Sequence, residues 1–334
     1  MAGIDDIIKL SGVSRSTVFR FMNGSNVRSE AKKAIIQAME RLNYKTDAII
    51  KQQNVSIEIS ISNNFEGFKG FTEVVQGIIQ RADERGVRVN LATRSKDQIT
   101  EHYTRWNKDE GLKGVIVVGK NKEDEDKEAE MLKAGSIPHV FVNRIMNDPY
   151  ISYVSVDLKQ AAYDIVRYLI DCGHSKIAVI GSPKVFRVDS DKLEGYKLAF
   201  HDTDTKVPQG FYIEIEDPDD WESNIRNMFE SNNIPSAFFA ICDSQAMKFA
   251  HLAQSYGYRV PEDISVVGMD DVEAAAYFKP ALTTVHVPFR KMGLTAVDNL
   301  LQMITNDEVS NIRTIIRHKL VIRESARKSI HEFK

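Results

Sequence analysis

The sequence predicts a small all-α domain followed by an α/β core built on doubly wound parallel sheets. The 334 residues are long for one hydrophobic core and suit two or three domains. Residues 1–53 show the apolar spacing of short helices, and the rest of the chain alternates short apolar runs with amphipathic stretches. Residues 1–53 carry a net charge of +4 and the remainder −7. A basic head on an acidic body suggests that the head meets a polyanion.

The head is predicted to form three short helices. The first has an apolar stripe at near-helical spacing, made by Ile4, Ile7, Ile8 and Leu10. Gly12 gives the freedom that a tight turn requires, and Ser14 is a good N-cap for a second helix over Arg15–Asn23. A third helix, capped by Ser29, runs from about Glu30 to Leu42. Two helices joined by a Gly-containing turn make a helix-turn-helix.

The second helix presents a polar and basic face that suits DNA. In a helix-turn-helix, the N-terminal part of this helix enters the major groove. There Arg15 can pair with a guanine edge, Ser16 can read either a donor or an acceptor, and Thr17 and Arg20 would contact base or phosphate. Arg28, like Asn26, follows the helix, where backbone contacts usually fall. The alternative is a protein-binding bundle with solvated arginines, and spacing alone leaves both open.

A resemblance to a known family favours DNA. The segment SGVSRSTVFRFMNGS resembles the helix-turn-helix signature of the LacI/GalR repressors, and VRSEAKKAIIQAMERLNYKTD resembles their third helix and its exit. The resemblance implies that Arg15 and Ser16 hold the two main base-reading positions, with Arg20 beside them. The predicted DNA contacts are Ser14, Arg15, Ser16, Thr17, Arg20, Asn23, Asn26 and Arg28.

Two features depart from that family pattern. Phe19 stands where the family usually has Ser, so it either packs against a thymine methyl or the first helix, or loses a phosphate contact. The linker Lys45–Asn54 lacks the usual Pro and the Leu that family members wedge into the minor groove. Gln53 stands nearest that position, and Ile50 could substitute in a shifted hinge. Whether an apolar wedge kinks the DNA therefore stays open.

The body alternates strands with amphipathic helices. The apolar runs are short and continuous, as in strands buried on both faces of a parallel sheet. Helices are predicted at Phe71–Arg85, Leu158–Cys172 and Asp243–Tyr256. The predicted strands are Val55–Ile61, Val87–Ala92, Gly114–Val118, His139–Val142, Ile177–Ile180, Phe211–Ile215, Ala237–Ile241, Ser265–Val267 and Ile315–Leu320.

The sequence offers no catalytic or metal-binding pattern. It contains no GxGxxG, P-loop or GxSxG, and no Cys/His set has metal-ligand spacing. We therefore expect no enzyme activity, cofactor or metal. The acidic run Glu123–Glu130 is read as a solvated helix face, and His174 as structural.

The sequence also lacks the marks of export or membrane insertion. No apolar run approaches 18 residues, and the first residues show no signal-peptide pattern. We expect a cytoplasmic protein with no membrane contact, in which Cys172 and Cys242 are buried, reduced thiols.

The body also resembles the LacI/GalR core, which is related to periplasmic sugar-binding proteins. The matching segments are YLIDCGHSKIAVIGS, VPEDISVVGMDD and PALTTVHVPFRKMG. The resemblance implies a homodimer and a two-lobed, periplasmic-binding-protein-like core with crossovers near Asp157, His286 and His318. It divides the chain into a head (1–46), a hinge (47–55), a first subdomain (56–157 and 286–318) and a second (158–285 and 319–330).

The resemblance also places a small-molecule effector, a sugar or sugar derivative, between the lobes. The carboxylate of Asp270 can accept hydrogen bonds from two adjacent hydroxyls. Lys192 replaces the usual Arg, so this position carries a compact ammonium charge instead of a planar guanidinium group with paired donors. This suits a phosphate or carboxylate, unless Lys192 is solvated and Arg187 binds instead. The predicted effector contacts are Asp270, Lys192, Trp221, Asn143, Asp243 and Phe68.

Three of these predicted contacts either have an alternative role or lie at or beside a position that departs from the family pattern. Trp221 is either an aromatic platform for the ligand or a core residue. Asn143 sits where the family typically has Asp. Asp243 follows Cys242, which occupies a position where Asn is frequent.

Together these features predict a transcription regulator, a repressor that binds a palindromic double-stranded operator as a homodimer under effector control. Two other classes fit the body alone, a solute-binding protein and an α/β enzyme acting on a sugar or nucleotide. The helix-turn-helix head and the missing signal peptide argue against the first. The missing catalytic residues argue against the second.

Overall fold

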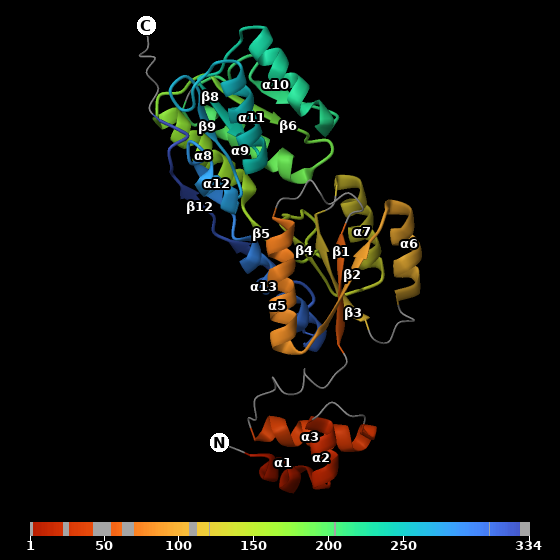
Figure 1. Ribbon diagram of the computed structural model, residues 1–334. Coiled ribbons are helices and arrows are strands. Elements are labelled where there is room, and N and C mark those ends of the chain that lie inside the picture. The colour runs from red at the N-terminus through yellow and green to blue at the C-terminus, as the bar shows by residue number, and fades with distance from the viewer. Residues whose placement is uncertain are drawn as a thin grey trace.

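The computed structural model describes residues 3–22, 27–42, 55–61, 70–106, 112–119, 121–203, 205–306 and 308–327. Figure 1 shows a helical head and an α/β core. The hinge positions Ile50 and Gln53, and the predicted contacts Asn23, Asn26 and Phe68, lie outside the described residues.

The head contains the three helices that the sequence predicts. They are α1 (Ile4–Ser11), α2 (Arg15–Met22) and α3 (Ser29–Arg41). Their apolar faces meet in a small separate core made by Ile7, Val18, Phe21, Ile35, Ala38 and Met39. Ser29 is the first residue of α3 rather than the residue before it.

The first lobe is built on a parallel sheet of six described strands in the order β11-β5-β4-β3-β1-β2. The strands are β1 (Ser56–Ile61), β2 (Arg88–Thr93), β3 (Leu112–Val118), β4 (His139–Val142), β5 (Tyr153–Val156) and β11 (Arg313–Ile316). One face is covered by α5 (Phe71–Arg85) and α13 (Phe289–Thr305) and the other by α6 (Lys96–Arg105) and α7 (Lys122–Ala134).

The helices α5 and α13 approach closely because each carries a glycine at the contact. A Cβ atom on Gly77 would lie 2.2 Å from the carbonyl oxygen of Arg290, and one on Gly293 would lie 2.2 Å from that of Val74. Only glycine leaves room for two backbones this close.

The second lobe is built on a four-stranded parallel sheet in the order β7-β6-β8-β9. Its strands are β6 (Ile177–Gly181), β7 (Tyr212–Glu214), β8 (Ala237–Ala240) and β9 (Ser265–Val267). Along β8, Ala237 and Phe239 face one core while Phe238 and Ala240 face the other, as period-2 side chains of a doubly covered sheet must. The covering helices are α8 (Leu158–Asp171) and α9 (Arg187–His201) on one side, and α10 (Trp221–Glu230) and α11 (Asp243–Ser255) on the other.

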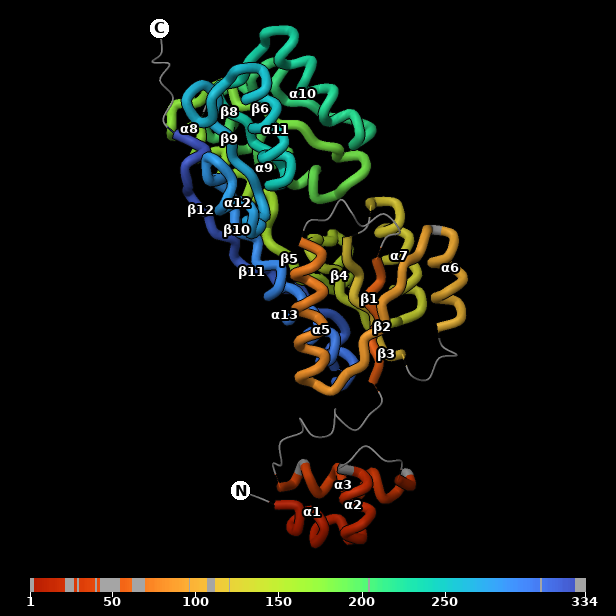
Figure 2. The backbone as a smooth tube through the Cα atoms, in the orientation of Figure 1, coloured from red at the N-terminus to blue at the C-terminus, as the bar shows by residue number. Residues whose placement is uncertain are grey.

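Three short connections join the lobes. The chain leaves the first sheet between β5 and α8. It returns from β10 (Thr284–His286) into α13, and leaves again between β11 and β12 (Lys319–Val321). Figure 2 labels β10, β11 and β12 along this path, and β10 and β12 pair antiparallel.

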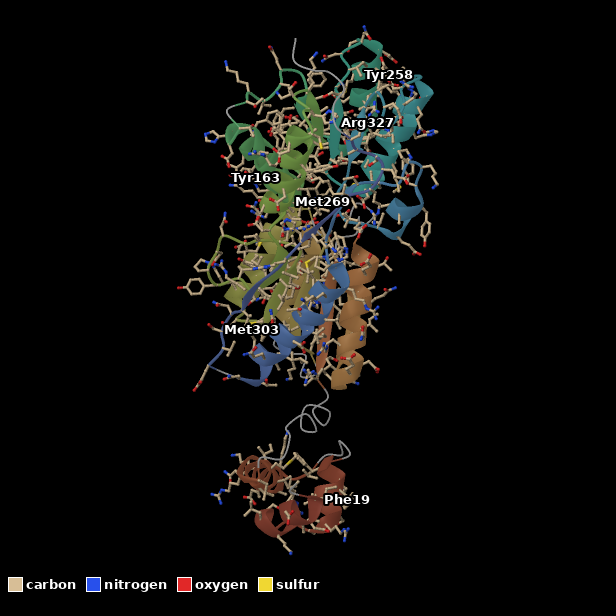
Figure 3. All side chains as sticks on the ribbon, turned by 90° about the vertical axis from the view of Figure 1, so that its left-hand side faces the viewer. Phe19, Tyr163, Tyr258, Met269, Met303 and Arg327 are labelled. Atoms are coloured by element: carbon tan, nitrogen blue, oxygen red, sulfur yellow. The ribbon has the colours of Figure 1, made fainter. Side chains whose placement is uncertain are left out.

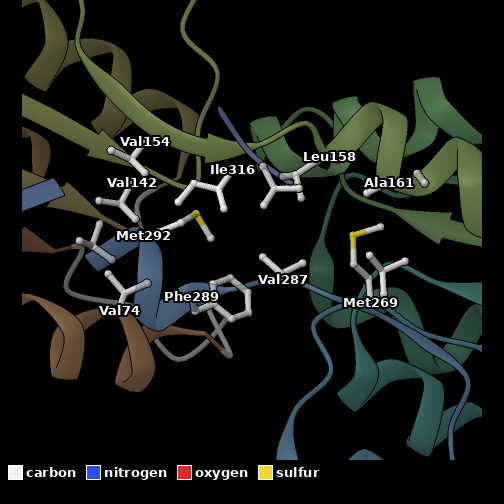
Figure 4. Close-up of a cluster of buried hydrophobic side chains, with 14 of the residues drawn as sticks. Val74, Val142, Val154, Leu158, Ala161, Met269, Val287, Phe289, Met292 and Ile316 are labelled. Carbon is white, nitrogen blue, oxygen red and sulfur yellow. The ribbon is translucent and has the colours of Figure 1, made fainter. Parts of the chain in front are cut away.

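One apolar cluster continues through these connections. Figure 4 shows Val287 lying between Phe289 on the first-lobe side and Met269 on the second-lobe side. All three side chains are buried. Since apolar burial is the main favourable term in folding, this shared cluster ties the lobes together.

The strand predictions need two corrections. Ile315–Leu320 is not one strand, because Arg317 and His318 separate β11 of the first sheet from β12 of the crossover. The strands β5 and β10 were not predicted. Neither forms the continuous apolar run on which the predictions relied, because Ser155 interrupts β5 and β10 holds a single apolar residue, Val285.

Candidate DNA interface and effector site

The turn of the head is fixed by two small residues. Gly12 has a φ of 67°, a left-handed conformation that glycine adopts without strain. Ser14 caps α2 as predicted, because its Oγ accepts a hydrogen bond from the backbone N–H of Thr17 at 3.3 Å. The Ser14 hydroxyl also contacts those of Ser16 and Thr17 at 3.1 and 2.8 Å. The first turn of α2 holds no acidic residue, so its positive dipole end suits an anion.

The predicted recognition face of α2 is exposed. Arg15, Ser16, Phe19 and Arg20 all lie on the surface, whereas Val18 is fully buried. The guanidinium of Arg15 lies 5.7 Å from the centre of the Phe19 ring, which is labelled in Figure 3. Phe19 therefore lies beside the principal predicted base-reading side chain, outside the small core of the head. Arg28, just before α3, is also exposed.

The predicted effector residues of the second lobe lie where its strands end. Asp270 follows β9, Asp243 begins α11 after β8, and Lys192 lies on α9. In doubly wound folds, ligands bind at the carboxyl ends of the strands. Cys242 lies near both Asp270 and Lys192, because the charges of both influence the pKa of its thiol, which burial raises. The fold thus brings Asp270, Lys192 and Cys242 together.

Lys192 is buried, so the alternative that it is solvated is wrong. Its side chain is 6% exposed, and Nζ donates to the carbonyl oxygen of Ile241 at 2.7 Å. Asp189, one turn earlier on α9, lies close enough for the Lys192 charge to oppose the rise that burial causes in the Asp189 pKa. Asp189 in turn accepts from the backbone N–H of Ser182 at 2.9 Å.

Asp243 is tied to the backbone around Asp270. Its Oδ2 accepts from the N–H of Val272 at 2.9 Å, and its Oδ1 accepts from the hydroxyl of Thr284 at 2.5 Å. The side chain is fully buried, and burial raises its pKa to about 6. Both oxygens are thus used inside the protein, and Asp243 fixes the loop that carries Asp270.

The two remaining described residues occupy different surroundings. Asn143 follows β4 of the first lobe with a φ of 61°, a left-handed conformation that Asn tolerates, and its Oδ1 is buried. Trp221 opens α10 and is 6% exposed, packed edge-on against Phe238 in the core of the second lobe. Its role as a platform remains a prediction.

Sequence reasoning missed the buried charges between the two lobes. Arg144, next to Asn143, lies near Asp189 and Asp191 of α9, and burial raises the pKa of Asp191 to about 6. The acidic run was also misread, because Glu125 and Glu128 are buried rather than solvated. The one sequence feature that could have indicated these buried charges is the spacing of Asp189 and Lys192, which lie three residues apart and therefore on the same face of a helix.

The other polar residues have structural partners. His174 contacts the Ser236 hydroxyl at 3.1 Å through Nδ1 and the Arg327 carbonyl at 2.9 Å through Nε2, so its predicted structural role is confirmed. Arg327 is labelled in Figure 3. Cys172 and Cys242 are free thiols, but both residues are partly exposed rather than buried as expected. The described residues hold no group of three His, Cys, Asp or Glu that could bind a metal ion, and none of their helices is long and apolar enough to cross a membrane.

An exposed helix-turn-helix joined to a two-lobed α/β core defines a class of DNA-binding transcription regulators. Comparison with known proteins agrees. The profile "Bacterial regulatory proteins, lacI family" matches residues 3–47, and "Periplasmic binding protein-like domain" matches residues 166–326. The chain therefore combines a lacI-family DNA-binding domain with a periplasmic-binding-protein-like domain.

Curated relatives match nearly the whole chain. The HTH-type transcriptional repressor PurR of Aliivibrio salmonicida is 27% identical, covering 99% of this chain and 100% of its own. Catabolite control protein A of Priestia megaterium is 28% identical, covering 97% and 99%. Among solved structures, the CelR–cellobiose complex has a TM-score of 0.73 at 25% identity, covering 98% of this chain and 100% of that one.

Proposed function

We propose that the protein is a repressor that binds a palindromic operator as a homodimer, one half-site per subunit, and is controlled by a small-molecule effector. The exposed face of α2 carries this proposal. Arg15 and Ser16 lie on the surface in the first turn of α2, the part of the helix that enters the major groove in this motif, and Arg20 is exposed in the last turn. The curated relatives PurR and catabolite control protein A are named as a repressor and a control protein.

An unbiased selection of double-stranded DNA by the purified protein, repeated at two salt concentrations, tests this function. We expect a short palindrome whose half-sites are separated by a whole number of helical turns. Binding without a consensus, weakened steeply by salt, would mean that the head contacts only phosphates. That result would refute the proposal.

The homodimer is supported by an apolar edge on the first lobe. β2 is the last strand of its sheet, and Leu91 on it is 59% exposed. Ile79, on the adjacent helix α5, is also exposed. A sheet edge with large apolar side chains is a surface that proteins usually cover, and we propose that a second copy covers it. Sedimentation of Leu91→Glu against the wild type measures this contact.

For the effector we propose a sugar-like molecule between the lobes, near Asp270, Lys192 and Asn143. These side chains lie at or near the carboxyl ends of strands in both lobes. The similar structure of CelR contains cellobiose. Lys192 is held by Ile241 and faces Asp189, so its charge is already partly compensated. We therefore favour a neutral polyhydroxylated effector over a phosphate or carboxylate. Phe68 and Trp221 stay proposed contacts, with Asp243 as a positioning residue. We further propose that the protein acts in the cytoplasm.

A further inference from the structure

The start of α7 in the first lobe contacts the start of α9 in the second. Arg187, the first residue of α9, lies with its guanidinium 3.5 Å from Glu125 Oε2 of α7 and forms a second, shorter ion pair with Asp126. The backbone N–H of Lys122, the first residue of α7, donates to the carbonyl oxygen of Val185 at 2.9 Å. Figure 1 shows α7 at the side of the first lobe.

The carboxylate of Glu125 is shared between the lobes. On its other side, Arg144 of the first lobe places Nε 2.9 Å from Glu125 Oε1. Glu125 is only 1% exposed, and burial raises its pKa while the two arginines oppose that rise. A buried carboxylate is stable as an ion only when it is paired. The side chain therefore requires its arginine partners.

The helix ends show why these charges lie here. A cation at a helix N-terminus is disfavoured by the helix dipole, so Arg187 is poorly placed for α9 itself. The first turn of α7 carries Glu123, Asp124 and Glu125, which its own dipole favours. The acidic start of α7 thus compensates the charge of Arg187 at the start of α9. This pairing gives the acidic run a role that its sequence did not reveal.

We propose that Glu125 and Arg187, with Asp126, form an interlobe latch that holds the two lobes together. The three residues are positioning residues: they set how far α7 lies from α9. Arg144 of the first lobe and Asp189 of α9 lie close enough for the charge of one to act on the other, and the same contact would hold them there. The relevance of the latch to effector control rests on the proposed function. The existence of the latch does not rest on the proposed function, because the contact between the lobes can be measured without effector or DNA.

The Lys122 amide provides a direct readout. First-turn N–H groups have no acceptor within their own helix, and the hydrogen-bond acceptor of this one belongs to the other lobe. We expect Arg187→Gln in the full chain to speed hydrogen exchange of this amide on the order of tenfold. The radius of gyration from small-angle scattering should also rise. Arg187→Lys keeps the positive charge but lacks the planar guanidinium group. Compared with Arg187→Gln, it should restore part of the protection of the Lys122 amide against hydrogen exchange.

A pair within one lobe gives the matched control. Lys159 of α8 and Glu194 of α9 form an ion pair at 2.6 Å, and Glu194→Gln should leave both the Lys122 amide and the radius unchanged. Unchanged exchange in Arg187→Gln would overturn the latch. Equal acceleration in Arg187→Gln and Glu194→Gln would overturn it too, because it would reflect general loss of stability. Failure to find an operator would refute the proposed function and leave these measurements unaffected.

Discussion

Replacing Asp243 by Asn should lower the stability of the protein clearly at low pH and only slightly at neutral pH. The carboxylate accepts from the N–H of Val272 and from the hydroxyl of Thr284. An amide group has one acceptor oxygen, so one of these two donors loses its partner. Leaving a buried donor unsatisfied destabilises a protein by about 1–3 kcal/mol.

The pH dependence follows from the raised pKa of Asp243, which is about 6 in the folded protein and about 3.9 in an unfolded chain. The folded state therefore binds the proton more tightly, and this group contributes stability below pH 4 that is lost as the pH rises through 6. Between pH 4.5 and 7.5 the loss is about 2 kcal/mol. Asn does not titrate, so the variant avoids this loss.

Urea unfolding of both proteins at pH 4.5 and 7.5 tests the reasoning. The variant should be clearly less stable than the wild type at pH 4.5 and close to it at pH 7.5. Asp217→Asn is the control: this exposed residue also accepts a backbone N–H, that of Asp219 at 2.9 Å, and its replacement should change the free energy of unfolding little, because Asn caps a helix as well as Asp. A deficit in Asp243→Asn that is equal at both pH values, or larger at pH 7.5, would refute the argument.

Three further changes separate the parts of the molecule. Arg15→Ala should weaken operator binding by about 1–3 kcal/mol and relax preference at one base pair per half-site; anisotropy titrations of base-substituted duplexes measure this, and a uniform loss would show that Arg15 contacts only phosphate. Asp270→Ala should abolish the effector response with operator affinity largely intact; unchanged effector affinity in calorimetry would remove Asp270 from the site. Gly293→Ala places a Cβ 2.2 Å from the carbonyl oxygen of Val74 and should lower the free energy of unfolding by about 1–3 kcal/mol; an unchanged urea midpoint would contradict it.

The head could be predicted residue by residue because its signals are local. Gly12 in the turn, Ser14 at the cap and Val18 on the inner face depend only on neighbours within a few positions. The parallel sheets followed from short apolar runs. The break between β11 and β12 was missed although Arg317 and His318 interrupt the apolar run there, because a short polar interruption does not by itself show that the chain changes lobes.

The charges of the site were harder to predict because their partners are distant in sequence. Lys192 looked solvated or ligand-bound until Ile241, 49 residues away, supplied its acceptor. Glu125 looked like one of several surface acids until Arg187 from the other lobe reached it. An ionisable side chain is identified as buried only when its partner is known. The sequence alone does not pair residues across lobes.

The hydrogen bonds around Asp270 indicate how a bound effector would act on the rest of the protein. The next residue, Asp271, accepts from Arg323 at 2.7 Å and pairs with His286 at 3.0 Å. Arg323 follows β12, and His286 ends β10 three residues before α13. Two of the three connections between the lobes are therefore adjoined by residues, His286 and Arg323, that are bonded to the residue beside the proposed ligand carboxylate. Because a ligand shifts a conformational equilibrium only through contacts that differ between the states, an effector that moves this loop acts directly on the segments that set the angle between the lobes. Such a movement would be passed on to α13 and its close partner α5 in the first lobe, whose β1 is the first described strand after the head.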